Sequence, residues 1–232
     1  MNNFQENFYD KRSENIKQLG FLGFLYYKFK KFETHRHDAV LSLIEKNRHE
    51  KMLDIGCNNG FFLSKAKSYT GIKNIFGTDI SLRLIEKCRC LFPENLNNFS
   101  VQNIDAGFNF PDNFFDLITM IAVLEHVFDP INAVREIQRI LKPGGIFIVE
   151  VPNIAFISYR LNLFFGIRPR TSWGYGWDGG HLSYFTKKDL KKALGENGFK
   201  IIETTGSGIF LNLRKFWGSL LLPNIIIKAE KI

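Results

Sequence analysis

Short apolar runs alternate with amphipathic segments along most of the chain, and this alternation predicts the order of its secondary structure. Apolar runs bounded by turn residues predict strands, and apolar residues that recur every three or four positions predict helices. The pattern places helices at 61–68, 81–91 and 130–141, and strands at 52–55, 74–78, 99–103, 115–121, 146–151, 199–205 and the final segment IIIKAEK. Such alternation favours an α/β fold with a doubly wound, mostly parallel, seven-stranded sheet.

The two ends of the chain carry further helical patterns. Residues 1–50 are predicted helical, with Ala39, Val40, Leu43 and Ile44 on one face. A later helix is predicted to start after Thr186, because Asp189 stands three positions on, and to stop before Gly198. The final strand is expected at an antiparallel edge of the sheet.

Composition and charge limit the class of protein. Three cysteines are too few for a disulfide framework, which favours a reducing cytoplasm. The start of the chain does not resemble a secretory signal, and the longest uncharged apolar run contains Pro223, so a soluble protein is expected. The net charge of +8 suggests an acidic partner, but the basic residues form scattered groups and no continuous stripe, so nucleic acid is not the expected ligand.

The segment LDIGCNNGFF, residues 53–62, ends an apolar strand in a glycine turn before a helix. Backbone N–H groups at such a helix start face a crevice at the carboxyl edge of a parallel sheet. The dinucleotide fingerprint G-x-G-x-x-G requires glycine where this turn has Asn58 and Phe61, and the Walker pattern is absent. The turn therefore predicts close approach to a ligand without a pyrophosphate.

Acidic residues follow the first three predicted strands at the same edge. Asp79 stands nineteen residues after Gly60, the place of a carboxylate that accepts both hydroxyls of a ribose. Asp105 is placed to accept from the exocyclic amine of adenine, and Asp54 to bind an ammonium group or to steady the turn. Carboxylates at these positions suit a nucleoside ligand that carries positive charge.

The segments MLDIGCNNGFFL, IFGTDIS, the long stretch from NIDAGF through LEHV and LKPGG, and GHLSYFTKKDL occur in the order and spacing of a known family. On these motifs residues 50–205 resemble a class I S-adenosylmethionine-dependent methyltransferase, of the small bacterial group that includes ubiquinone-biosynthesis O-methyltransferases and enzymes of cell-surface sugar clusters. The resemblance implies a Rossmann-like domain over residues 46–232, with a helical lid at 1–45 and a substrate flap at 153–185, in a single domain overall.

The resemblance also implies which residues hold S-adenosylmethionine. Gly56 to Gly60 would line its methionine portion, Asp79 its ribose and Asp105 its adenine. Asn58 replaces a glycine that is frequent in the family, and asparagine tolerates a positive φ best among the other residues. Arg36 matches in spacing an arginine that clamps the methionine carboxylate, although an ordinary surface arginine remains an alternative. The full set of expected cofactor residues is Arg36, Asp54, Gly56, Cys57, Asn58, Gly60, Asp79, Ile80, Asp105, Ala106, Met120 and Ile121.

Two histidines are candidate catalytic residues, because imidazole titrates near working pH and a hydroxyl acceptor must lose its proton. They are His126, in LEHV, and His181, in GHLSYF. The alternative for His126 is packing against the cofactor or capping the next helix. Glu125 and Asp178 are weaker candidates, and no metal site is predicted.

The aromatic and basic segment from Arg168 to Phe185 is expected to bind the acceptor, since aromatic faces stack on sugar rings or quinones and arginines hold phosphate or carboxylate. Its candidate residues are Arg168, Arg170, Trp173, Tyr175, Trp177 and Tyr184. The expected reaction is methylation of a hydroxyl on a small-molecule or saccharide acceptor, as in polysaccharide biosynthesis. Quinone precursors, carrier-bound acyl groups, amines and RNA stay open, as do a non-catalytic binding protein and a dehydrogenase. Peripheral membrane contact by the N-terminal segment stays open as an alternative to the lid but is not expected.

Overall fold

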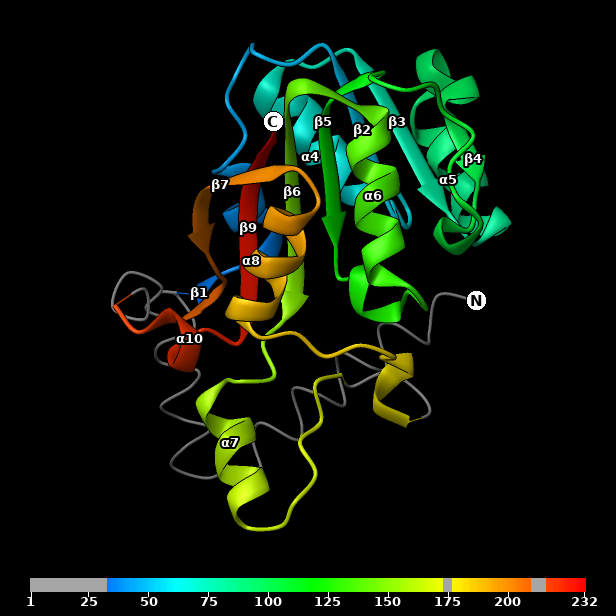
Figure 1. Ribbon diagram of the computed structural model, residues 1–232. Coiled ribbons are helices and arrows are strands. Elements are labelled where there is room, and N and C mark those ends of the chain that lie inside the picture. The colour runs from blue at the N-terminus through cyan, green and yellow to red at the C-terminus, as the bar shows by residue number, and fades with distance from the viewer. Residues whose placement is uncertain (1–32, 173–176, 210–215) are drawn as a thin grey trace.

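The computed structural model describes residues 33–172, 177–209 and 216–232 (Figure 1). Its centre is a seven-stranded sheet in the order β4-β3-β2-β5-β6-β9-β7. The first five of these strands run parallel, and β9 is antiparallel to both of its neighbours. The mostly parallel, seven-stranded sheet expected from the sequence is confirmed. Its strands are β2 (Lys51–Ile55), β3 (Asn74–Asp79), β4 (Phe99–Val101), β5 (Phe115–Ile121), β6 (Leu141–Pro152), β7 (Phe199–Thr205) and β9 (Asn224–Lys231).

Helices cover both faces of this sheet. Buried side chains of α6 (Pro130–Ile140) and α8 (Lys187–Glu196) form one apolar cluster with one face. Those of α3 (Arg36–Leu41), α4 (Phe61–Thr70) and α5 (Leu82–Leu91) form a second cluster with the other face. Figure 1 shows α6 and α8 in front of the sheet and α4 behind it. The domain is therefore a three-layer α/β sandwich with a core on each side.

Local sequence explains where the helices on the front face begin. The Asp129 side chain accepts a hydrogen bond from the backbone N–H of Asn132, and Pro130 occupies the first turn of α6. Helix α8 starts with the predicted capping box, in which Thr186 and Asp189 each accept from the other's backbone N–H. Gly198, with φ of 82°, follows the end of α8, as the sequence predicted.

The final strand was wrongly expected at an edge of the sheet. Strand β9 lies between β6 and β7, and its run Ile225–Ile227 is buried, whereas the centre of β7 is partly exposed. A strand with apolar residues at three consecutive positions is covered on both faces, which an interior place provides. Strand β7 is the edge.

The helix expected over residues 1–50 is shorter where the structure describes it. Helix α3 ends at Leu41, and residues 42–50 form turns in which Asn47 has a φ of 57°. The predicted buried face is nevertheless present, since Ala39, Val40, Leu43 and Ile44 are all buried. Before α3, the two-residue strand β1 (Glu33–Thr34) pairs antiparallel with β8 (Gly208–Ile209). Residues 1–32 of the expected lid lie outside the described residues.

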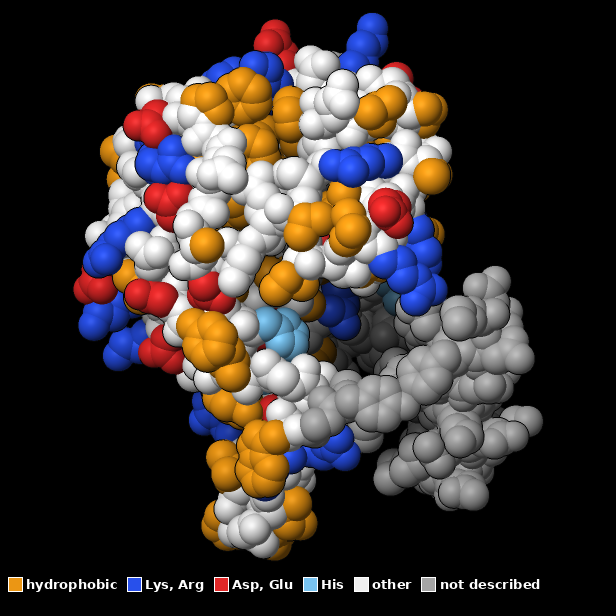
Figure 2. Space-filling model, turned by 90° about the vertical axis from the view of Figure 1, so that its right-hand side faces the viewer, with side chains coloured by type: hydrophobic (Ala, Val, Ile, Leu, Met, Phe, Trp, Pro, Cys, Tyr) orange, Lys and Arg blue, Asp and Glu red, His pale blue; other side chains and the backbone are white. Residues whose placement is uncertain are grey.

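Several short elements lie beyond the carboxyl ends of the parallel strands. Helix α7 (Ile157–Phe164) projects from this end of the molecule (Figure 1) and has no fully buried residue. Figure 2 shows hydrophobic side chains gathered on the projecting part. None of the helices in the described part of the chain has the length and hydropathy of a membrane span. The remaining elements are η2 (Pro93–Asn98), η3 (Ile104–Ala106), η4 (Leu124–His126), η5 (Trp177–Gly180) and α10 (Gly218–Leu221).

Candidate functional site

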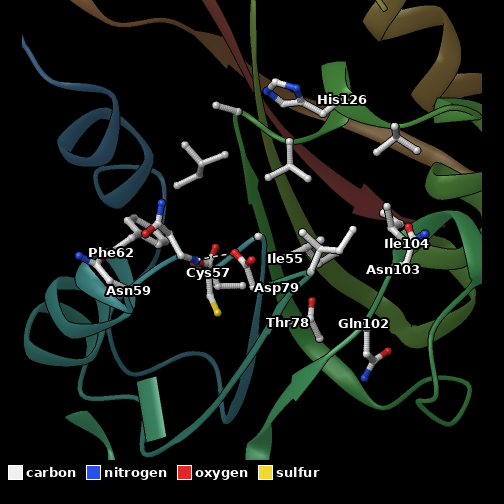
Figure 3. Close-up of a pocket in the computed structure, with 18 of the residues that line it drawn as sticks. Ile55, Cys57, Asn59, Phe62, Thr78, Asp79, Gln102, Asn103, Ile104 and His126 are labelled. Carbon is white, nitrogen blue, oxygen red and sulfur yellow. Dashed lines mark hydrogen bonds between the residues drawn. The ribbon is translucent and has the colours of Figure 1, made fainter. Parts of the chain in front are cut away.

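A cavity of about 810 Å³ opens at the carboxyl ends of β2, β3, β4 and β5. Its walls come from the glycine turn after β2, the end of β3, the segment after β4 and the loop after β5, as Figure 3 shows. This is the edge of the sheet where the sequence placed the ligand, and the volume is within the range of small-molecule sites.

The glycine turn has three residues in the left-handed region. Gly56, Asn58 and Gly60 have φ values of 71°, 50° and 79°, so Asn58 adopts the conformation predicted for it. The backbone N–H groups of Gly56 and Cys57 both donate to the carbonyl oxygen of Thr78, which ties the turn to β3. A Cβ on Gly56 would lie 2.3 Å from a methyl carbon of Val123. Only glycine therefore allows this approach of two cavity walls.

The carboxylate of Asp79 joins the turn to the helix that follows β3. One oxygen accepts from the backbone N–H of Asn58 at 3.0 Å, and the other accepts from that of Ser81 at 2.9 Å. Each carboxylate oxygen has two acceptor positions, so Asp79 keeps acceptor capacity for ligand hydroxyls. The structure places this carboxylate on the cavity wall, as the ribose assignment requires.

Asp54 lies deeper in the same wall. Its carboxyl oxygen accepts from the hydroxyl of Thr119 at 2.6 Å, and burial raises the pKa of Asp54 to about 7. A ligand cation beside Asp54 would favour the ionised carboxylate.

Asp105 and two exposed apolar side chains also line the cavity. One carboxylate oxygen of Asp105 accepts from the backbone N–H groups of Phe128 and Asp129, at 3.0 and 3.4 Å. Ile80 and Phe128 line the cavity although they are 74% and 83% exposed. Apolar side chains left open to solvent at a cavity mouth suit a planar base. The glycine cradle, the Asp79 acceptor and these faces together fit an adenosine-type cofactor.

Most of the residues predicted to hold the cofactor meet at this cavity. Three do not line it: Gly60 ends the turn, Ala106 lines a shallow neighbouring depression, and the Met120 side chain is buried in the core. Only the backbone of Met120 is therefore available to contact the cofactor. Lining residues that the sequence did not single out include His37, Phe62, Gln102, Asn103, Val123 and Phe128. They sit on loops or one turn into a helix, without a motif of their own.

The two candidate histidines lie against each other. His126 is exposed and lines the cavity, whereas His181 is 9% exposed and lies behind it. Their rings are 4.7 Å apart at an angle of 74°. One ligand atom from each histidine and one from Glu125 lie within 4.8 Å of one another, close enough to ligate one metal ion. Burial, and then the neighbouring His126, lower the pKa of His181, which favours its neutral form.

Two buried glutamates lie beneath this corner of the cavity. The carboxyl oxygens of Glu125 and Glu150 have no hydrogen-bond partner among the described residues, and both side chains are at most 2% exposed. Burial, and then Glu150, raise the pKa of Glu125 to about 8. Arg36, which lines the cavity, holds Nη1 3.8 Å from a carboxyl oxygen of Glu150. The burial of Glu150 was not predictable, because its position in a strand does not by itself distinguish it from a surface residue.

The expected acceptor residues lie outside the cavity wall, near its histidine corner. The Arg168 guanidinium stacks on the ring of Trp177 at 4.3 Å, and Trp177 is 75% exposed. Tyr184 is hydrogen-bonded to the buried carboxylate of Asp178. Arg170 is exposed on the same segment. Trp173 and Tyr175 lie outside the described residues.

Comparison with known proteins places the chain in a family. The family model for a methyltransferase domain matches residues 28–204. An uncharacterized methyltransferase of Schizosaccharomyces pombe is 32% identical over 114 residues, covering 46% of this chain and 40% of that protein. A demethylmenaquinone methyltransferase of Staphylococcus epidermidis is 28% identical over 141 residues, covering 58% of each chain. The chain thus spans well under two thirds of the length of these relatives.

Solved structures share the fold at low identity. An S-adenosylmethionine-dependent methyltransferase from Mesorhizobium loti superposes with a TM-score of 0.62 at 17% identity, covering 83% of this chain and 96% of that one. A methyltransferase of Haloferax volcanii, solved with its activator, gives a TM-score of 0.62 at 16% identity and covers 96% and 94%. At such identities the likeness concerns the fold alone.

Proposed function

This chain belongs to the class I S-adenosylmethionine-dependent methyltransferases, and we propose that it methylates a hydroxyl of a small or glycan-linked acceptor such as a nucleotide-linked or cell-surface sugar. S-adenosylmethionine supplies an electrophilic methyl group on its sulfonium. The chain then has to hold donor and acceptor in line, exclude water and take the proton of the hydroxyl.

Donor binding is assigned to the glycine turn and the acidic wall. In the proposed mode, the half-buried Asp79 accepts from the ribose hydroxyls, and Ile80 and Phe128 flank the adenine beside Asp105. Asp54 stands where a carboxylate would face the positively charged methionine portion. Arg36, at the other side of the cavity, is the candidate partner of the methionine carboxylate.

Acceptor binding is assigned to the segment that follows β6. The observation that carries the sugar proposal is the exposed Trp177 ring with the Arg168 guanidinium stacked on it at 4.3 Å. An exposed indole stacks on the apolar face of a sugar ring, and a neighbouring arginine binds a phosphate. A nucleotide sugar contains both a sugar ring and phosphate groups. The net charge of +8 also favours an anionic acceptor.

A quinone ring is the second candidate acceptor, because the chain is 28% identical over 141 residues to a demethylmenaquinone methyltransferase. A planar quinone would stack on the same indole but would leave Arg168 without an anionic partner. The two proposals therefore differ in their dependence on this arginine.

The test is a methyl-transfer screen with purified full-length protein and S-adenosylmethionine. Nucleotide sugars and a demethylated quinone are offered separately, and the product is identified by the mass of an added methyl group. We expect a methylated nucleotide sugar, with a rate reduced in Arg168→Ala and unchanged in the control Lys192→Ala on the exposed face of α8. Methylation of the quinone alone, independent of Arg168, would contradict the sugar proposal.

A further inference from the structure

The segment Asp178–Gly180 has an unusual backbone next to the histidine corner. Asp178, Gly179 and Gly180 have successive φ values of 51°, 66° and 82°. Three consecutive left-handed residues are rare, and a non-glycine residue among them is strained. Such a strained conformation persists only where contacts with neighbouring residues stabilise it.

The carboxylate of Asp178 supplies those contacts. It is fully buried and accepts from the backbone N–H groups of Thr171 and Ser172 at 2.8 and 3.1 Å, and from the Thr171 hydroxyl at 2.7 Å. The hydroxyl of Tyr184 donates a further hydrogen bond to this carboxylate. Burial alone would raise the pKa of Asp178, but the hydrogen bonds from Thr171, Ser172 and Tyr184 lower it below its ordinary value. Asp178 is therefore an ionised acceptor that ties the turn to residues 171 and 172.

The turn presents a carbonyl to His126. The carbonyl oxygen of Gly180 lies 3.0 Å from Nδ1 of His126. A carbonyl oxygen only accepts, so Nδ1 of His126 carries the hydrogen and donates it. The other ring nitrogen, Nε2, then has a free lone pair on a side chain that lines the cavity.

The same network orients His181. Thr171 has one hydroxyl hydrogen, which it donates to Asp178, so its oxygen accepts from Nδ1 of His181 at 2.7 Å. Nε2 of His181 then faces a carboxyl oxygen of Glu125 at 3.8 Å. His181 is held at the back of His126, where it packs edge to face against the exposed ring.

We propose that His126 receives the proton of the acceptor hydroxyl on Nε2, and that Asp178 and Thr171 are positioning residues that hold His126 through Gly180 and His181. The inference rests on the proposed methyl transfer. His126 is chosen over His181 because it is exposed on the cavity wall, whereas His181 is buried behind it. Asp178 and Thr171 do not line the cavity, and they act on it only through Gly180 and the two histidines.

The proposed step transfers a methyl group and a proton and conserves atoms and charge. The acceptor oxygen gives its proton to Nε2 of His126 and forms the new bond to the methyl carbon. The bond between that carbon and sulfur breaks, and its electron pair stays on sulfur, which becomes a neutral thioether. The positive charge passes to the imidazole ring, where the buried carboxyl of Glu125 lies within 4.8 Å, and the ring later releases its proton to water.

The first test reads the tautomer directly and needs no acceptor. Nitrogen NMR of full-length protein labelled in histidine and saturated with S-adenosylhomocysteine should show the proton of His126 on Nδ1. Thr171→Val should shift the signals of His181 and His126, while Thr171→Ser restores them. A His126 ring protonated on Nε2 in the unaltered protein would overturn the proposal, whatever the acceptor proves to be.

The second test uses the acceptor identified by the methyl-transfer screen. His126→Gln should lower kcat by roughly a hundredfold, the contribution of a general base, and Asp178→Asn by roughly tenfold, with S-adenosylhomocysteine affinity unchanged in both. The exposed His35→Gln is the matched control. Equal loss of kcat and cofactor affinity would make these residues structural. Loss of activity on chelation, restored by a divalent ion, would make the Glu125–His126–His181 group a metal site and would also overturn the proposal.

Discussion

The carboxylate of Asp79 lies 3.0 Å from the backbone nitrogen of Asn58, and this bond joins the end of β3 to the glycine turn after β2. Asn58 holds a φ of 50° at the centre of that turn. A single acidic side chain therefore shapes the turn and faces the cavity.

Asp79→Ala should weaken S-adenosylhomocysteine binding by about tenfold or more, because it removes a charged acceptor for the ribose hydroxyls and the bond to Asn58. Isothermal titration calorimetry measures the change. Asp112→Ala removes an exposed carboxylate that does not line the cavity and serves as the control. Unchanged affinity in Asp79→Ala would refute the ribose assignment.

Gly56→Ala should destabilise the domain and abolish cofactor binding. The new Cβ would lie 2.3 Å from Val123, at a φ of 71° that costs a further ~1–3 kcal/mol. Gly195→Ala is the matched control, because Gly195 lies within α8 with open space around it. That variant should be as stable as the parent or up to ~1 kcal/mol more stable in urea unfolding. Equal stability of the two variants would show that the turn tolerates a side chain.

Asp54→Asn should change how stability depends on pH. Burial raises the pKa of Asp54 from 3.8 to about 7 on folding, so the folded state binds more protons than the unfolded state in this window. The contribution of Asp54 to stability is present below pH 4 and is lost as the pH rises through 7. Between pH 5 and pH 8 the free energy of unfolding of the variant should therefore gain on that of the parent by on the order of 2 kcal/mol. A constant difference across this range, measured by urea unfolding, would show that Asp54 is already ionised.

Removal of residues 1–30 should leave S-adenosylhomocysteine binding intact and impair methylation of the acceptor, as expected for a lid over the acceptor. The described cofactor residues all lie after this segment, starting at Arg36. Titration calorimetry and the methyl-transfer assay separate the two effects. Normal methylation by the truncated protein would contradict the lid.

Much of the fold was readable from local pattern. Strand β5 begins and ends at the predicted residues 115 and 121, because the apolar run that predicts it is local in sequence. The capping box at Thr186 was visible because its two partners are only three positions apart. The place of β9 was not readable, since strand order depends on which faces are buried. Helix α3 ends at Leu41 and is followed by turns, although the buried apolar positions continue to Ile44.

The cofactor wall was likewise more predictable than the histidine corner. The glycine turn and Asp79 belong to motifs with regular spacing. The contact between Gly180 and His126, by contrast, joins positions 54 residues apart through a left-handed turn. Nothing in the local sequence states that Asp178 is buried or that Glu150 lies near Glu125, because both facts arise from the packing of segments that are distant in sequence.

The most direct test of the account is a calorimetric titration of the full-length protein with S-adenosylhomocysteine, with NAD as the comparison ligand. The account predicts micromolar binding of S-adenosylhomocysteine, weakened by about tenfold or more in Asp79→Ala, and no binding of NAD. Absence of binding at millimolar S-adenosylhomocysteine would contradict it and would favour a protein that retains the fold without the reaction.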